Sequence, residues 1–267
     1  KGTALLLTLL WVVCMRDNKL KARLCARDFA KTKRADLFAP GSTSLTNRVI
    51  AFKAVKRALV TFTVDVTAAY NIIPEPEDVV CVPPPEWLAH RASLGLSVDV
   101  LWRMKKLLPG RRIAAKLWVS HVGTTLKGEG FVQDTAFPQF FQHPDKDMTV
   151  EVHMDDMHGC GSLEDSKAFL SNIGEILPLK RAEVHLPGSV YCHLKREYHV
   201  FEDGIFCMPN AKHVLSVVER LGLKDAKTAP TPATEDAKPV QEDLDYPLDE
   251  VQSSEYRSLV CTLLYPS

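Results

Sequence analysis

The sequence predicts an α+β fold built on antiparallel strand pairs, and three stretches carry this prediction. Residues 148–161 hold an alternating run, two adjacent aspartates and a second short run with Gly159 and Gly161, typical of a strand, a tight turn and a returning strand. Residues 59–66 form a β-branched, apolar strand, and residues 163–176 a helix that begins after a capping serine with acids in its first turn. With 46% hydrophobic residues among 267, a packed core is expected.

The other elements follow in chain order from local patterns. A hairpin is expected from strands at 5–15 and 20–26 around an Asp-Asn turn, and an amphipathic helix at 44–57 from its apolar spacing. Further strands are predicted at 79–82, 137–142, 190–201 and 205–208, and further helices at 111–126 and 211–221, the last of these ending at Gly222. The predicted organisation is a main domain at 1–222, an acidic, Pro-rich linker at 223–250 and a truncated segment at 251–267.

Charge is distributed unevenly, although the formal net charge is +0. Residues 1–57 hold thirteen Lys and Arg against three Asp and Glu, whereas residues 225–255 hold two against nine. The basic excess suggests a phosphate-bearing partner, and a solvated charged surface is the alternative.

The seven cysteines are scattered and form no Cys-x-x-Cys pair, which favours a reducing compartment. We therefore expect an intracellular protein, cytoplasmic or nuclear and not secreted. The apolar run at 4–14 is too short to cross a bilayer, so no membrane partner is expected. The chain begins with Lys rather than Met, which suggests a fragment of a longer protein.

Asp155 and Asp156 in the predicted turn are the candidate catalytic residues. Two carboxylates at a strand end fit a two-metal phosphoryl-transfer site when a third carboxylate joins them. Asp65 is the candidate for the third, because a carboxylate near the end of an apolar strand is costly to bury unless it is paired or metal-bound. The alternative is that the aspartate pair is an ordinary solvated corner.

Five motifs in order resemble the reverse transcriptase domain of Ty1/copia-type LTR retrotransposon polyproteins, over nearly the whole chain. They are Lys21-Ala-Arg-Leu-Cys-Ala-Arg-Asp-Phe29, Phe38-Ala-Pro40, Val64-Asp-Val-Thr-Ala-Ala-Tyr70, His153-Met-Asp-Asp156 and Tyr256-Arg-Ser-Leu-Val-Cys-Thr-Leu-Leu-Tyr265. Their order makes the resemblance more specific than any one motif alone.

The resemblance implies a right-hand polymerase architecture, with fingers, a palm with an antiparallel sheet, and a small thumb. It implies an RNA-directed DNA polymerase that uses an RNA or DNA template with a primer, dNTPs, and two Mg²⁺ ions or Mn²⁺ in their place. Asp65 and Asp155 would bridge the metals, Asp156 would support them, and the Val66 carbonyl would be a further ligand. RNase H and integrase domains would lie outside this fragment.

The resemblance also implies two binding surfaces. The nucleotide-binding residues would be Lys21, Arg23, Tyr70 and Met154. The template-primer would lie on a basic stretch that contains Lys105, Lys106, Arg111, Arg112 and Lys116. The alternatives are charges on an exposed edge strand for the first pair, a core aromatic for Tyr70, and a solvated helix face for the basic stretch.

Three positions depart from the family's motifs. Ile113 stands where the family has glutamine, His153 where it has an aromatic residue, and Lys195 where it has glycine. One alternative function is therefore an inactive copy that retains only nucleic-acid binding. A second is a non-catalytic interaction module, for which Asp65 would lie far from Asp155.

Overall fold

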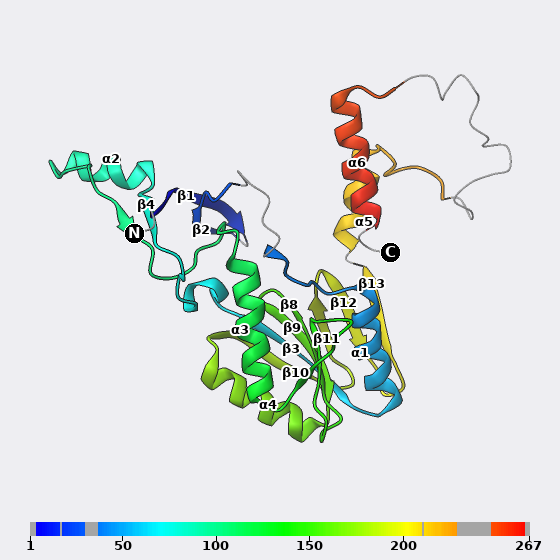
Figure 1. Ribbon diagram of the computed structural model, residues 1–267. Coiled ribbons are helices and arrows are strands. Elements are labelled where there is room, and N and C mark those ends of the chain that lie inside the picture. Colours follow the sequence, from blue (N-terminus) through cyan, green and yellow to red (C-terminus); the bar gives the residue numbers. More distant parts are fainter. Residues whose placement is uncertain (1–3, 17, 30–36, 210, 229–246, 265–267) are drawn as a thin grey trace. The chain divides into compact units, whose positions relative to one another are not determined.

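The computed structural model describes residues 4–16, 18–29, 37–209, 211–228 and 247–264 (Figure 1). It contains six α-helices and three β-sheets within these ranges, an α+β fold as predicted. The chain divides into two compact units, Lys1–Leu186 and Pro187–Ser267. The boundaries expected at 222 and 250 stay predictions.

The larger sheet of the first unit has six strands in the order β10-β3-β9-β8-β7-β6, and every neighbouring pair is antiparallel. The strands are β3 (Val60–Val66), β6 (Val132–Gln133), β7 (Phe140–Gln142), β8 (Thr149–His153), β9 (Asp156–Gly161) and β10 (Leu179–His185). The predicted strands at 59–66 and around the aspartate turn are thus present, and the strand predicted at 137–142 is present only at Phe140–Gln142. Neither β6 nor β10 was predicted, and β10 matters for the site because it pairs with β3.

One face of this sheet packs against α3 (Ala114–Gly128) and α4 (Leu163–Ile176). Alternation along the strands directs Phe62 and Val150 into this core, where they join Trp118 of α3 and Phe169 of α4. The Ser162 hydroxyl caps α4 by accepting a hydrogen bond from the Asp165 amide. The predicted α4 agrees with the structure, whereas α3 begins three residues later than predicted.

The opposite face carries α1 (Ser44–Lys56), which runs along β8, β9 and β3 (Figure 1). The helix predicted at 44–57 is present as α1, but of the apolar residues that predicted it only Ile50 is buried. Leu45, Val49, Phe52 and Val55 are exposed, whereas Ile50 is buried together with Thr46, Asn47 and Ala54. The buried Glu151 carboxylate of β8 accepts a hydrogen bond from the Thr46 hydroxyl, and this contact helps to hold the Thr46 side of α1 against the sheet.

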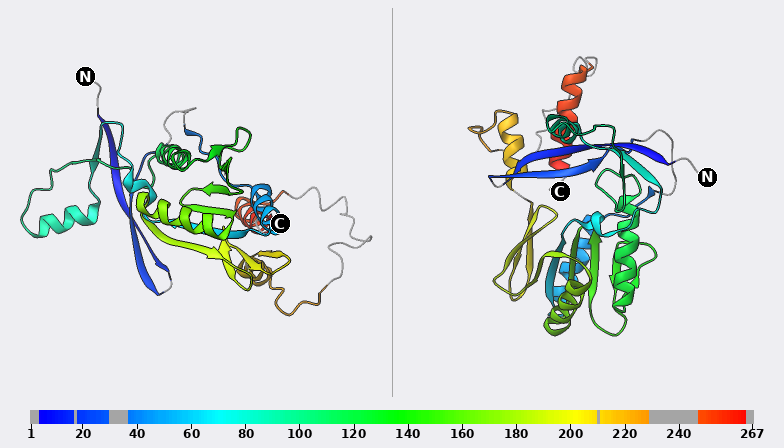
Figure 2. Two further views of the ribbon diagram at one scale, coloured as in Figure 1. Left: turned by 90° about the horizontal axis from the view of Figure 1, so that it is seen from below. Right: turned by 90° about the vertical axis from the view of Figure 1, so that its left-hand side faces the viewer.

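A second sheet of the first unit has the order β2-β1-β4-β5. It comprises β1 (Leu5–Arg16), β2 (Lys19–Ala26), β4 (Val79–Val82) and β5 (Trp102–Arg103). The expected hairpin is β1–β2, a long antiparallel ribbon (Figure 2), and β1 pairs in parallel with β4. Helix α2 (Pro85–Ser93) follows β4, and a 3₁₀ turn, η2 (Ala69–Ile72), follows β3.

The second unit holds a three-stranded antiparallel sheet, β11 (Val190–His193), β12 (Arg196–Val200) and β13 (Ile205–Pro209), together with α5 (Ala211–Arg220) and α6 (Glu250–Leu264). The single strand predicted at 190–201 is therefore wrong. The chain turns at Leu194 and Lys195, which have φ of 47° and 60°, and returns as β12. Lys195 thus adopts the left-handed conformation that glycine favours, at the position where the family's motif has glycine. Most of the predicted linker lies outside the described residues.

Candidate active site

Asp65 and Asp156 lie directly opposite each other, on the neighbouring strands β3 and β9. Directly opposed residues of an antiparallel pair point to the same face, with Cβ atoms about 4.5–5.5 Å apart. Asp155 precedes Asp156 in the β8–β9 turn, where its carbonyl accepts a 2.9 Å hydrogen bond from the Val66 amide. The end of β3 is therefore fixed against the turn, and residues ninety positions apart in sequence come together here. This is contrary to what the interaction-module alternative requires.

The charges around these aspartates are unequal. Burial, followed by the negative charges of Asp155 and Asp65, raises the pKa of Asp156 to about 6. The Asp65 carboxylate instead forms an ion pair with Lys180 of β10. Lys180 directly precedes Arg181, the residue that pairs with Asp65 across β10 and β3. Lys180 was missed because β10 was missed, although the alternation of Ala182 and Val184 with polar residues is a strand signal.

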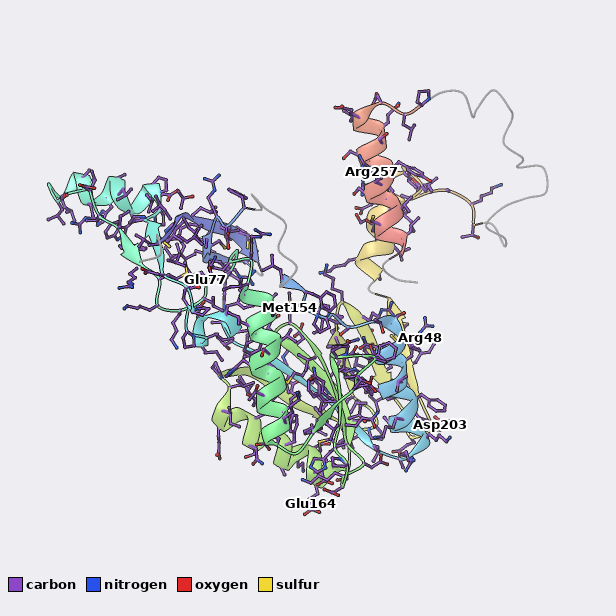
Figure 3. All side chains as sticks on the ribbon, viewed as in Figure 1. Arg48, Glu77, Met154, Glu164, Asp203 and Arg257 are labelled. Carbon is purple, nitrogen blue, oxygen red and sulfur yellow. The ribbon has the colours of Figure 1, made fainter. Side chains whose placement is uncertain are left out.

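The β8–β9 turn that contains Asp155 is held by hydrogen bonds from neighbouring segments. Met154 has a φ of 54°, which is unfavourable for a side chain of this size, and it lies at the tip of the hairpin (Figure 3). The indole N–H of the buried Trp118 donates to the Met154 carbonyl, so α3 supports the turn. His153 accepts a 3.1 Å hydrogen bond from the Ser42 amide through Nδ1. Burial lowers the pKa of His153 and Asp155 opposes this shift, so a neutral ring is expected at this site.

A pocket of about 650 Å³ opens beside the turn. Four predicted residues line it, namely Arg23, Tyr70, Met154 and Asp155, and the rest of its wall comes from Trp11, Ala22, Leu24, Ala68, Ala69, Asn71, Leu108 and Pro109. Its volume is in the range of small-ligand sites, roughly 300–1,000 Å³. Lys21, Asp65, Val66 and Asp156 are not among its lining residues.

The residues fit a hard divalent cation in their chemistry. Mg²⁺ prefers carboxylate oxygens, and the carboxylates of Asp65, Asp155 and Asp156 belong to neighbouring positions at this strand end. Within the described residues, however, the oxygens of Asp65, Asp155 and Asp156 do not all lie within 4.8 Å of one another. The expected convergence of the three carboxylates on a metal therefore stays a prediction, as does the Val66 carbonyl ligand, and Asp65 is paired with Lys180 in this structure.

The predicted basic stretch divides into exposed and buried parts. Lys105, Lys106 and Lys116 are exposed, Lys106 donating a 2.7 Å hydrogen bond to the Ile72 carbonyl, and Arg112 is partly buried. Arg111 is different, because its guanidinium has no exposed surface. The interpretation of Arg111 as a contact to the template-primer is therefore wrong.

Arg111 lies at the centre of a buried ion-pair cluster. It donates to Glu75 at 2.8 and 2.9 Å, to Glu77 at 2.9 Å, and to Asp28. Burial alone would lower the pKa of Arg111, but the hydrogen bonds and charges of the three carboxylates raise it above its usual value. The sequence contains no signal for this cluster, because its members come from three separate segments.

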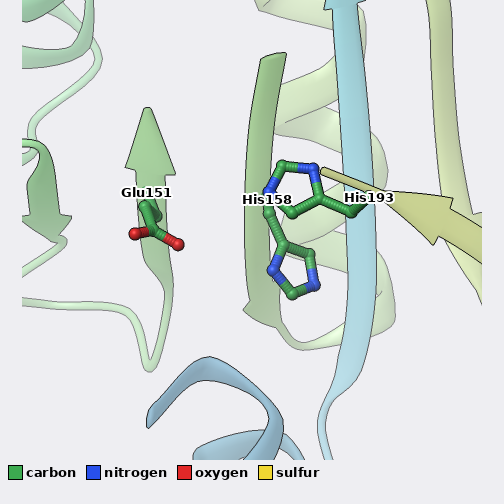
Figure 4. Close-up of side chains that lie close together, drawn as sticks. All are labelled: Glu151, His158 and His193. Carbon is green, nitrogen blue, oxygen red and sulfur yellow. The ribbon is translucent and has the colours of Figure 1, made fainter. Parts of the chain in front are cut away.

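A second polar pair lies on the α1 face of the six-stranded sheet. Glu151 of β8 and His158 of β9 face each other in register, and both are buried (Figure 4). Burial raises the pKa of the Glu151 carboxyl, while hydrogen bonds from Thr46, Ser42 and Thr43 oppose the shift. Thr46 and Glu151 thus join α1 to the strand that leads into the aspartate turn.

Comparison with protein-family models gives no match for this chain, and comparison with curated proteins gives none either. No helix in the part of the chain that the structure describes is long and apolar enough to cross a membrane.

Proposed function

We propose that this chain is an RNA-directed DNA polymerase domain of the copia type, with the right-hand architecture that its motifs imply. The observation that carries the proposal is the arrangement at one end of the six-stranded sheet. Asp65 and Asp156 face each other across β3 and β9, and Asp155 lies at the adjoining turn on the wall of the pocket. A strand-end carboxylate cluster beside a nucleotide-sized pocket is what nucleotidyl transfer to a primer 3′-hydroxyl requires.

The pocket residues have separable roles in this proposal. Arg23 is a guanidinium on the β2 side, suited to the triphosphate oxygens of a dNTP. Tyr70 offers a ring at which the sugar would lie, and Met154 and Asp155 close the pocket at the turn. Two Mg²⁺ ions, or Mn²⁺, when bound by Asp65, Asp155 and Asp156, would neutralise charge at the attacking and leaving oxygens.

Primer extension on an RNA template tests the proposal. Asp155→Asn keeps the shape of an exposed side chain and removes its charge, so it should leave stability within about 0.5 kcal/mol and lower extension by about 100-fold or more. Asp145→Asn is the matched control, because Asp145 is an exposed aspartate in the β7–β8 connection, and it should retain wild-type extension. Equal activity in the two variants would contradict the proposal.

The alternative function is an inactive copy that retains only template-primer binding, and one observation favours it. Ile113, at the position where the family has glutamine, is buried in the main core and does not line the pocket. Two assays on the wild type distinguish these functions. Salt-sensitive binding of template-primer without any primer extension would support the inactive copy.

A further inference from the structure

The buried Arg111 cluster joins the β1–β2 ribbon to the body of the first unit. Asp28 follows β2 by two residues, Glu75 and Glu77 precede β4, and Arg111 lies in the connection before α3. The side chains of Arg111 and Glu75 have no exposed surface, and that of Asp28 is 11% exposed. Charge-assisted bonds in such a dry environment are strong and directional.

Backbone contacts extend the same junction. The Asp28 carboxylate also accepts a 3.0 Å bond from the Arg112 amide, and the Ala26 amide donates a 2.8 Å bond to the Pro109 carbonyl. Gly110 is needed for this approach, because a Cβ there would lie 2.1 Å from the Ala26 carbonyl oxygen. The loop at 108–112 is therefore tightly fitted to the end of β2.

The junction borders the pocket. Leu108 and Pro109 of this loop line the pocket, and so do Ala22, Arg23 and Leu24, which precede Ala26 on β2. The rest of the wall comes mainly from the η2 segment and the β8–β9 turn. Arg23 lies on β2, whereas Tyr70 and Asp155 lie on other elements, so a shift of the end of β2 would move Arg23 relative to both.

We infer that Arg111 is a positioning residue for the nucleotide pocket: by binding Asp28, Glu75 and Glu77 together, it holds the Arg23 wall at a fixed distance from the Asp155 wall. Arg111 does not touch the pocket space and acts through β2. This inference rests on the proposed function for the identity of the ligand. That Arg111 holds the end of β2 in place does not depend on the proposed function. Leaving a buried carboxylate such as Glu75 without its partner is costly, so removal of the guanidinium should release the end of β2.

The test compares Arg111→Met with Arg103→Met in the full chain. Arg103 is an exposed arginine on β5, in the sheet that contains β2. Its guanidinium forms an ion pair with the Asp78 carboxylate, with an N–O distance of 2.9 Å. Amide hydrogen exchange should accelerate by about tenfold or more at Ala26 and Arg27 in Arg111→Met, with the β3 and β9 amides within about twofold of the wild type. Arg103→Met should change neither group. Uniform acceleration across the unit, or none at β2, would overturn the inference.

Kinetics provide the second readout. In primer extension Arg111→Met should raise KM for the dNTP by about tenfold while kcat per folded enzyme stays within about threefold, because the site is loosened rather than its aspartates removed. Arg111→Lys keeps the positive charge but lacks the planar guanidinium with its several N–H donors, so it should recover part of the affinity for the dNTP. A fall in kcat with unchanged KM would overturn the inference.

If Arg111→Met does not fold, Glu77→Gln is the milder variant, because that carboxylate is 36% exposed. It should give a smaller change in the same direction in both readouts, and no change would overturn the inference. If the wild type extends no primer, the proposed function fails, and the exchange measurement alone decides whether Arg111 holds the ribbon.

Discussion

Asp65 of β3 and Asp156 of β9 occupy directly opposed positions, so their carboxylates leave the same face of the sheet at the same strand end. Burial, followed by the negative charges of Asp155 and then Asp65, raises the pKa of Asp156 to about 6. The strand pairing that creates this proximity depends on the packing behind it, where β9 approaches β3 and β8 closely. The first prediction concerns that packing.

Gly159 should tolerate no side chain. A Cβ at Gly159 would lie 2.4 Å from Cζ of Phe62 and 2.5 Å from the Thr149 carbonyl oxygen, one on each neighbouring strand. Gly159→Ala should therefore lower the free energy of unfolding by about 3 kcal/mol or more, since neither neighbour can move freely. Chemical denaturation measures this change in the free energy of unfolding.

Gly128→Ala is the matched control for this substitution. Gly128 ends α3, and a Cβ there meets nothing within 4 Å. Alanine should stabilise the helix by about 0.5–1 kcal/mol. Equal effects of the two substitutions would mean that β9 can move away from its neighbours and that the register around Asp156 is not enforced by packing.

Local patterns were sufficient to predict most of the six-stranded sheet. The β-branched run of β3, the two-residue turn between β8 and β9 and the Ser162 cap of α4 are decided by neighbours in sequence, and the structure has all three. The failures have non-local causes. Four apolar residues of α1 are exposed because the helix buries Thr46 against a buried carboxylate on β8, and no periodicity within α1 contains that information.

His185 predicts a loss of stability on acidification. It is buried at the end of β10, where its Nε2 lies 2.8 Å from the Thr63 hydroxyl. Burial, followed by the positive charge of Arg181, lowers the pKa of His185 to about 4. An unfolded histidine titrates near pH 6.5, so between about pH 6.5 and 4 the unfolded chain binds more protons, and the free energy of unfolding must fall as pH falls.

His185→Gln should remove this loss. Relative to the wild type, the variant should gain up to about 3 kcal/mol between pH 7.5 and pH 4, as measured by denaturant titration at several pH values. Thr63→Val removes the hydrogen-bond partner but keeps the imidazole, so it should retain the pH dependence of the wild type. A constant difference between His185→Gln and the wild type would contradict the assignment.

Lys105 and Lys116 should account for part of the salt dependence of template-primer binding. Both are exposed, and each phosphate contact contributes a slope of about 0.9 in a plot of log affinity against log salt. Their double substitution by alanine should therefore reduce the slope by nearly two units. Lys127 and Lys167, exposed on α3 and α4, form the control pair and should leave the slope unchanged. Equal slopes in both double variants would indicate an ordinary solvated surface.

The surroundings of Arg111 could not be predicted from the sequence. In sequence, Arg111 lies in a basic stretch without acids nearby, and Arg112 and Lys116 beside it suggest a common role. In the fold, three carboxylates from distant segments surround it. The aspartates could be proposed as a site because they belong to sequence motifs, whereas an ion-pair cluster leaves no motif.

Tyr70 yields the last prediction, on the selection of the sugar. It lies on η2, half-buried, with its hydroxyl 4.0 Å from the Met154 sulfur and its side chain on the pocket wall. Burial, followed by the charge of Asp155, raises the pKa of Tyr70, so the phenol is neutral at physiological pH. A ring at this position would exclude a ribose 2′-hydroxyl and leave room for deoxyribose, which is discrimination by repulsion.

The alternative is that Tyr70 is only part of the core, since one side of it packs against the main cluster. Ile72 separates the two roles, because it packs against the same cluster from the same 3₁₀ turn but does not line the pocket. Tyr70→Ala should raise incorporation of CTP relative to dCTP by about tenfold or more, and Tyr70→Phe, which keeps the ring, should not. Ile72→Ala should lower stability by about 2 kcal/mol and leave the CTP/dCTP ratio unchanged. If Tyr70→Ala depresses both activities together, as Ile72→Ala should, the ring is a packing residue and sugar selection must come from another part of the pocket.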